Sequence, residues 1–319
     1  MEHLLKKIEE SYARRTGNPS LQKNCWERVT EILPPTLAAV SSDSPYSSGI
    51  IAEKSGDLGM ALLWIVEASL IRGLLGELIK EEPSGSRLRG IAENIGPELI
   101  GALAHSEDKD APLTLTEEGG RLLLSGRKKY ITGGSTADFI LITGREVGEE
   151  KISRMVLIPI GMLPPDALQE LSLNTLGTIS HASLNLERSG LPAHYAFSLE
   201  ASTLRRALKK WSLIERSLIL ESFLGLMLYI MNRSSGLIVF EGNIRETVQR
   251  MRIDQTAVIR KQIASALEGT RVEENRIPVQ ELLDCVQSLK RALENDAGIL
   301  SADLLARTRD LDLFSHIRL

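Results

Sequence analysis

The sequence predicts an α+β fold in which a β-rich segment lies between two helical segments. Three observations lead to this fold class. Apolar residues recur at helical spacing before about residue 85, short apolar runs separated by turn residues fill about 97–197, and helical spacing returns from about 200. We therefore expect an N-terminal helical domain over residues 1–90, a middle β domain over 91–198 and a C-terminal helical domain over 199–319.

The first helical segment opens with a charged amphipathic pattern over residues 1–15, which lacks the uninterrupted apolar core of an export signal. Its longest apolar run, 58–79, follows Asp57, a residue type that often caps helix N-termini. Glu67 and Arg72 lie within this run and would be costly in lipid. We therefore expect a buried core helix here, and no membrane partner.

The β segment is clearest over residues 119–145, where turn residues punctuate apolar runs. We expect turns at Ser125-Gly126 and at Gly133-Gly134, with strands at 121–124, 130–132 and 139–143. Further strands are expected at 99–104, 155–160 and 182–186. In the last of these, apolar and polar residues alternate, which predicts one buried face and one face in water.

Composition places the chain among soluble globular proteins, because 43% of its 319 residues are hydrophobic and 25% are charged. A net charge of −4 argues against a nucleic-acid partner or a basic membrane-binding surface. Cys25, Cys285 and the five histidines share no metal-ligand spacing, so we expect no metal site. The low cysteine content favours a reducing compartment and a cytoplasmic location.

The string from Gly126 to Arg145 carries a family resemblance. A glycine, a basic pair, an aromatic followed by Ile-Thr, a Gly-rich turn, Ala-Asp and an apolar strand ending in Arg resemble the middle domain of acyl-CoA dehydrogenases. The helix, β, helix order of the chain is also that of the acyl-CoA dehydrogenase fold. The resemblance implies a middle β-barrel or sheet domain and a C-terminal four-helix bundle.

The resemblance also implies a cofactor, FAD, with the flavin ring packed on Tyr130, Ile131 and Thr132 and the Thr132 hydroxyl near its N5 and O4 atoms. Ser106 takes the place of the threonine in a Thr-Glu loop that reaches the same cofactor. Gln249 lies near the position of a glutamine that reaches the FAD of a neighbouring subunit. An ordinary hairpin with a surface tyrosine is the alternative interpretation of the same residues.

Departures from the family pattern leave open whether FAD is still bound. Asp108 and Asp110 stand among residues that replace the proline and glycines near the flavin diphosphate, where carboxylates would repel it. Leu237 replaces an arginine that contacts FAD in the family, which removes a charge-assisted contact. A Gly-rich loop further on is reduced to fragments.

In the family, a carboxylate base removes the proton α to a thioester while the β-hydride passes to flavin N5. The commoner position of this base in the family falls on Arg318, which cannot act as a base at neutral pH. The less common position, within a Leu-x-x-Glu-Arg motif, falls on Glu215, with Arg216 beside it as a cofactor-binding residue. A buried glutamate must be paired or have a raised pKa, so simple pairing with a basic side chain is the alternative role for Glu215.

Three functions remain open from the sequence. The first is an FAD-dependent acyl-CoA dehydrogenase of fatty acid metabolism, with an acyl-CoA substrate and electron-transfer flavoprotein or a similar acceptor. The second is a catalytically degenerate member that forms the non-catalytic subunit of a hetero-oligomer. The third is an acyl-thioester binding protein without redox function. In each case the resemblance implies a homo- or hetero-oligomer.

Overall fold

The computed structural model describes residues 48–95, 99–173, 176, 179–235, 237–238, 243–273, 279–295, 300, 304 and 307–316. The predicted N-terminal helix, Cys25 and Arg318 lie outside these residues. The chain forms two compact units. We call them the β-unit, made of described residues within Val66–Leu173 and Ile179–Trp211, and the helical unit, made of those within Arg28–Ile65, Asn174–Thr178 and Ser212–Leu319. The three-domain division of the sequence stays a prediction.

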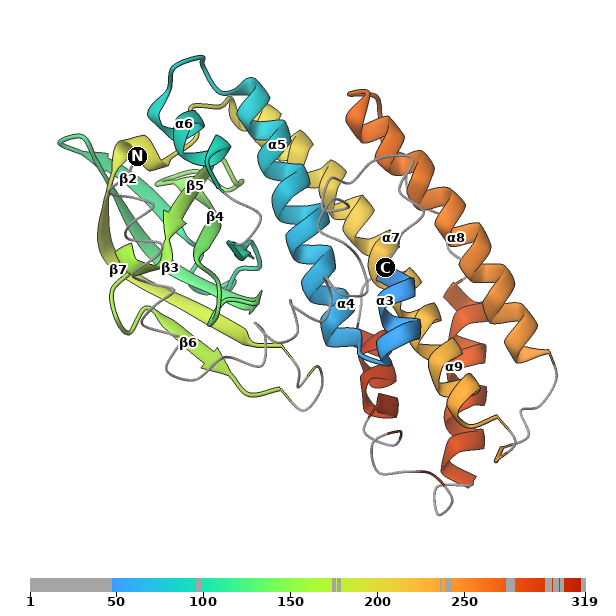
Figure 1. Cartoon of the computed structure of the whole chain (residues 1–319). Coiled ribbons are helices and arrows are strands. Elements are labelled where there is room, and N and C mark those ends of the chain that lie inside the picture. Colours follow the sequence, from blue (N-terminus) through green and yellow to red (C-terminus); the bar gives the residue numbers. More distant parts are fainter. Residues whose placement is uncertain are drawn as a thin grey trace. The chain divides into compact units, whose positions relative to one another are not determined.

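The β-unit is built on a curled seven-stranded sheet (Figure 1). Its strand order is β1-β4-β2-β3-β7-β6, and β5, which lies outside this order, pairs with β4. β4 runs parallel to β1 and β2, and the other pairs are antiparallel. The strands are β1 (Gly101–Ala104), β2 (Thr114–Glu118), β3 (Arg121–Thr132), β4 (Phe139–Glu146), β5 (Arg154–Pro159), β6 (Leu168–Leu171) and β7 (His181–Pro192). Most predicted strands are therefore present.

The expected turn at Ser125-Gly126 is wrong, because β3 runs without a break from Arg121 to Thr132. The hairpin turn is instead Gly119-Gly120 between β2 and β3, where both residues have positive φ, 57° and 75°, as a two-residue hairpin turn requires. Gly126 marks an irregularity in the β3–β7 pairing. A Cβ there would lie 2.4 Å from the carbonyl oxygen of Pro112, so only glycine fits without a shift.

One long helical run spans Leu58–Glu81 and consists of α4 (Leu58–Trp64), the π-helical η2 (Ile65–Ile71) and α5 (Arg72–Glu81). Asp57 caps it as predicted, by accepting a hydrogen bond from the amide of Met60 at 3.0 Å. Among the described residues it is the one helix long and apolar enough to cross a membrane by length and composition. Its most apolar window is 81% buried, which is typical of a core helix.

A buried ion pair within the β-unit joins this helix to the sheet. Glu67 accepts a hydrogen bond from the amide of Gly101 at 2.8 Å, at the start of β1, and from Arg72 at 2.9 Å. Arg72 also donates to the carbonyl of Leu99 at 2.7 Å. Burial raises the pKa of Glu67, while the Arg72 charge opposes this shift. The pair therefore fixes β1 against α5. The unit also contains α6 (Arg87–Glu93), the 3₁₀ turns η3 (Ile160–Met162) and η4 (Ala193–Tyr195), and the start of α7 (Ala201–Arg233).

The helical unit contains α3 (Ser48–Ser55), α4, most of α7, α8 (Ile244–Leu267), α9 (Val279–Asn295) and the 3₁₀ helix η5 (Arg309–His316). α7 packs against α3, where the Ser48 hydroxyl donates to the Leu218 carbonyl at 2.6 Å. It also packs against α8, where the Thr256 hydroxyl donates to the buried Glu221 at 2.7 Å. These polar contacts fix the helices along α7.

Candidate functional site

Tyr130 occupies a bulge in β3. The β3–β7 pairing runs from Lys128↔Leu184 to Ile131↔Ala182, so β3 has one more residue than β7 between these pairs. Tyr130 has a φ of 54°, a left-handed conformation that is costly for a bulky residue, and its side chain is 63% exposed. Bulges commonly re-aim side chains near functional sites. The strand therefore presents an aromatic ring to the outside at an energetic cost.

The residues that follow Tyr130 complete β3 and lead into a well-anchored turn that starts at Gly133. Ile131 is fully buried, and Thr132 is half-buried opposite His181 in the β3–β7 pairing. The amide of Gly133 donates to the Ser180 carbonyl at 2.8 Å, which ties the turn to the start of β7. The predicted turn at Gly133-Gly134 is thus present, but both glycines are buried, and the exposed residue is Tyr130 in the strand before the turn.

Ser106 lies beside this part of β3. The amide of Lys129 donates to the Ser106 carbonyl at 3.0 Å, and Glu107 pairs with Lys128 as an isolated antiparallel bridge. The Ser106 side chain is exposed. The structure therefore brings Ser106, Tyr130, Ile131 and Thr132 together in the β-unit.

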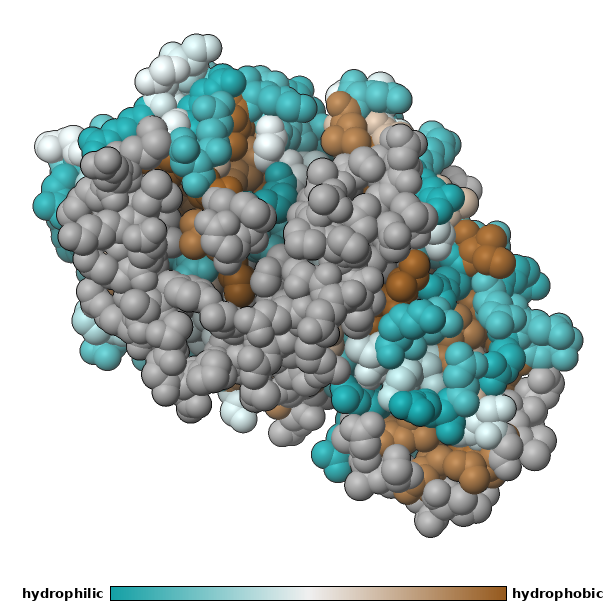
Figure 2. Space-filling model, in the orientation of Figure 1, coloured by the Kyte–Doolittle hydropathy of each residue, from teal (hydrophilic) through white to brown (hydrophobic). Residues whose placement is uncertain are grey.

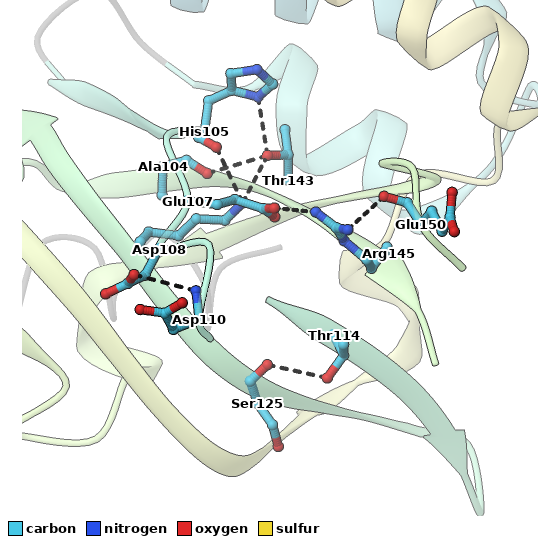
Figure 3. A network of polar contacts seen from close by, with 11 residues as sticks. Ala104, His105, Glu107, Asp108, Asp110, Thr114, Ser125, Thr143, Arg145 and Glu150 are labelled. Carbon is cyan, nitrogen blue, oxygen red and sulfur yellow. Dashed lines mark hydrogen bonds and ion pairs between the residues drawn. The ribbon is translucent and has the colours of Figure 1, made fainter. Parts of the chain in front are cut away.

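A buried lysine, Lys128, connects the Ser106 segment to the sheet. Figure 3 labels its partners His105, Glu107 and Thr143. The Lys128 side chain is fully buried, and its ammonium donates to Glu107 at 2.8 Å and to the His105 carbonyl and the Thr143 hydroxyl at 3.2 Å each. These three bonds use all three of its donors. Glu107 also pairs with Arg145 on β4. Burial lowers the pKa of Lys128, and the Glu107 carboxylate opposes this shift.

The acidic loop that follows Glu107 lines a cleft of about 560 Å³. Asp108 forms an ion pair with Lys129 at 3.2 Å, and the hydrogen bond from Lys129 lowers the pKa of Asp108. The cleft lining mixes both charges, since it includes Asp108 and Asp110 as well as Arg127 and Arg188. The expected repulsion of a diphosphate is therefore weakened at Asp108, whose charge is paired, and is retained at Asp110, which is exposed.

Glu215 lies in the helical unit, on α7, and is half-buried. It has no hydrogen bond or ion pair to any residue that the structure describes. Burial raises its pKa to about 7, and the charge of the exposed Arg216 opposes this shift. The alternative that Glu215 pairs with a basic side chain finds no partner in the described part of the chain. A carboxylate with this pKa can accept a proton near neutral pH.

Gln249 is exposed on α8 and lines a second cleft, of about 610 Å³, with Glu53, Leu228 and Arg252. Leu228 is on α7, about 20 Å along the helix axis from Glu215. Gln249 and Glu215 therefore do not share one contact site. Leu237, which replaces an arginine of the family pattern, is 50% exposed and supplies no charge.

Apolar side chains also reach the surface of α8. Ile253, beside Gln249 in the cleft lining, is 70% exposed, and Leu267 at the end of the helix is 48% exposed. Figure 2 shows apolar patches set among hydrophilic residues on one face of the molecule. Single exposed apolar residues are common on monomers, so they leave the expected oligomer a prediction.

The sequence did not predict that His181 is buried. The alternating pattern of 182–186 places its neighbours Ser183 and Asn185 on the wet face, yet His181 is only 5% exposed. β6 pairs along this end of β7, with Leu171 opposite His181. The pairing of this end of β7 with β6 could not be inferred from the sequence of β7 alone.

Neither protein-family models nor the sequences of curated proteins match this chain. Solved structures do. The prolyl acyl carrier protein oxidase AnaB superposes with a TM-score of 0.66 at 15% identity, covering 99% of this chain and 94% of AnaB. The fold is acyl-CoA dehydrogenase-like.

Two further structures support this fold assignment. Butyryl-CoA dehydrogenase from Megasphaera elsdenii has a TM-score of 0.60 at 12% identity, over 98% of this chain and 93% of that one. KijD3, in complex with FMN and a dTDP-linked amino sugar, has a TM-score of 0.67 at 12% identity, over 100% of this chain and 88% of that one. The α+β fold class predicted from the sequence is confirmed. Identities this low establish the fold alone.

Proposed function

We propose that the chain is an FAD-dependent acyl-CoA dehydrogenase-like flavoprotein that removes two hydrogens from the α and β carbons of an acyl thioester. The observation that carries the proposal is Glu215, a half-buried carboxylate with a pKa of about 7 and no described partner. A general base works best when its pKa lies near the working pH. Glu215 would take the α proton, whose acidity the thioester carbonyl raises.

The end of β3 and the neighbouring Ser106 segment suit a flavin ring. Tyr130 offers an exposed aromatic face for stacking, and Thr132 and Ser106 offer hydroxyl groups beside it. Bound flavin would supply the hydride acceptor, its N5 atom. On the diphosphate side, Asp108 is neutralised by Lys129, but Asp110 keeps an unfavourable charge. The flavin ring of FAD therefore fits the residues present better than its diphosphate does. We propose Arg216 and Gln249 as further cofactor contacts.

Names of the similar structures guide the substrate class. AnaB is named as an acyl carrier protein oxidase, and butyryl-CoA dehydrogenase is named for an acyl-CoA. Both names specify a thioester, which suits a carboxylate base of modest strength because the α proton is comparatively acidic. We propose acyl-CoA as the substrate, electron-transfer flavoprotein or a similar protein as the electron acceptor, and an oligomer as the working form in the cytoplasm.

A second candidate function is a non-catalytic subunit or acyl-thioester binding protein. Asp110 at the loop and Leu237 in place of an arginine favour it, because both would weaken the hold on a flavin diphosphate. Such a protein would have the same fold but would not carry out the redox step.

The deciding experiment is anaerobic reduction of the FAD-reconstituted protein by butyryl-CoA, followed by flavin absorbance. We expect bleaching whose rate rises about tenfold per pH unit below the pKa and levels off above about pH 7, as Glu215 loses its proton. Glu215→Gln should keep the flavin and bleach at least about 100-fold more slowly. Asp254→Asn, a change to an exposed carboxylate on α8, is the matched control and should bleach like the parent.

Two results would count against the proposal. A chain that takes up neither FAD nor FMN supports the second candidate. A Glu215→Gln variant that bleaches at the parent rate removes Glu215 as the base. Bleaching by an acyl carrier protein thioester but not by an acyl-CoA would move the substrate assignment to carrier-bound thioesters.

A further inference from the structure

Two polar atoms near the Tyr130–Thr132 end of β3 are buried without a partner in the described part of the chain. They are the Nε2 atom of His181 and the hydroxyl of Ser135. His181 is 5% exposed, so its imidazole gains nothing from water. Buried polar groups in folded proteins are nearly always hydrogen-bonded, and each exception needs an explanation. A bound ligand that supplies the missing partner is one such explanation.

His181 lies directly beside the proposed flavin-facing hydroxyl. Thr132 and His181 are opposite each other in the antiparallel β3–β7 pair, so their side chains point to the same face of the sheet. Directly opposed residues have Cβ atoms about 5 Å apart. A ligand that contacts the Thr132 hydroxyl is therefore within reach of the His181 ring.

Hydrogen bonds and strand pairing anchor the backbone on both sides of His181. Gly133 donates to the Ser180 carbonyl, and the Thr136 and Ser180 hydroxyls lie 3.4 Å apart, so the turn is tied to the residue before His181. On the other side, β6 pairs with β7 through Leu171 and His181. His181 thus lies on a strand that is paired on both sides, which limits how far its backbone can move to bring Nε2 to another hydrogen-bond partner.

The chemistry of this environment selects a neutral ligand group. Burial lowers the pKa of His181, so the imidazole is uncharged at neutral pH and has one N–H donor and one acceptor nitrogen. A phosphate or carboxylate would favour the imidazolium form, which burial opposes. A carbonyl oxygen or ring nitrogen of a planar heterocycle matches a neutral imidazole without adding charge.

We propose that His181 is a further ligand-binding residue of this site, and that its Nε2 atom forms a hydrogen bond with a polar ring atom of the bound flavin. The inference rests on the function proposed above, because the flavin is the planar heterocycle expected on Tyr130 and Thr132. It adds one residue from β7 to the proposed ring contacts in the β-unit, which otherwise come from β3 and the Ser106 segment.

The first test is direct observation of the imidazole in the full-length protein labelled with ¹⁵N-histidine. On titration with FAD, the Nε2 resonance of His181 should shift or change tautomer, while that of His194 should stay in place. His194 is a suitable control because it is half-buried in the same unit and stacks near Tyr195, with ring centroids 4.6 Å apart. His181→Gln assigns the resonance.

The second test measures flavin affinity in variants. His181→Leu should weaken FAD binding about tenfold, the size of one lost hydrogen bond, whereas His181→Gln should stay within about threefold, because its amide keeps a donor near the Nε2 position. His194→Gln should bind like the parent. If the leucine variant fails to fold, the glutamine variant and the resonance titration still decide.

An unshifted His181 resonance with FAD bound, or parent-like FAD affinity in His181→Leu, would overturn the inference while the proposed function stands. A parent chain that binds no flavin at all would overturn both. The two failures are therefore distinguishable by the parent titration alone.

Discussion

Lys128 shows how a single buried charge positions the site loop. Its ammonium satisfies Glu107, the His105 carbonyl and the Thr143 hydroxyl at once, so three chain segments converge on one atom. Removing one partner of a buried pair costs more than the pair contributes, because the remaining groups stay buried and unsatisfied. The segment that carries Ser106 and Glu107 depends on this side chain.

We expect Lys128→Met to lower the free energy of unfolding by about 2–4 kcal/mol. The neighbouring Lys129→Met, which removes a side chain that is 39% exposed, should change it by no more than about 0.5 kcal/mol. Urea unfolding followed by circular dichroism measures both variants. Equal midpoints for the two would show that the buried network does not hold the loop.

At single positions, the sequence predicted what depends on local chemistry and missed what depends on distant strands. Asp57 was predictable as a cap because its carboxylate bonds to an amide three residues away. The exposed Tyr130 followed from the turn residues after it. The burial of His181 and the lack of a described partner for Glu215 depend on segments far away in the sequence, which no local pattern contains.

At the level of elements, glycine was the ambiguous signal. Gly126 was interpreted as a turn, but it lies within β3, at a point where Pro112 approaches its backbone too closely for a side chain. Gly119-Gly120 makes the actual hairpin turn. Both uses require glycine, and only the tertiary contact distinguishes them. The strand positions were predictable from apolar runs, whereas the bulges within β3 and β7 were not.

Close helix packing within the helical unit gives a prediction of its own. Gly225 on α7 faces Gly49 on α3 so closely that a Cβ on Gly225 would lie 2.1 Å from the Gly49 carbonyl oxygen. Gly225→Ala should therefore destabilise the fold by about 1–3 kcal/mol through overpacking. Gly76→Ala is the matched control on α5, where a Cβ has no neighbour within 4 Å. Gly76→Ala should raise the free energy of unfolding by about 0.5–1 kcal/mol.

Chemical unfolding of the two alanine variants, monitored by helix circular dichroism, distinguishes these outcomes by sign. A stabilised Gly225→Ala would mean that α3 moves away from α7 without penalty. The close approach of the two helices would then have no role in holding them together.

For the whole molecule, the order of helical and β segments together with the string from Gly126 to Arg145 predicted the fold, although the solved structures compared above share only 12–15% identity with this chain. Apolar periodicity survives such divergence because many residues satisfy the same burial pattern. Site chemistry does not, since a base or a diphosphate contact needs one residue type at one position. Fold and activity therefore separate in this chain, and the activity needs its own whole-molecule test.

Flavin binding should appear as a rise in thermal stability of the intact chain. A ligand at 100 times its dissociation constant stabilises the folded state by about 2.7 kcal/mol. We expect FAD to raise the unfolding temperature and ADP alone to have little effect, because the proposed site has an unfavourable charge at Asp110 on the diphosphate side, whereas Tyr130 and Thr132 would hold the ring. FMN, which shares the ring, should then shift the temperature nearly as much as FAD. A large shift with ADP and none with FMN would reverse this picture and place the binding energy on the nucleotide half of the cofactor.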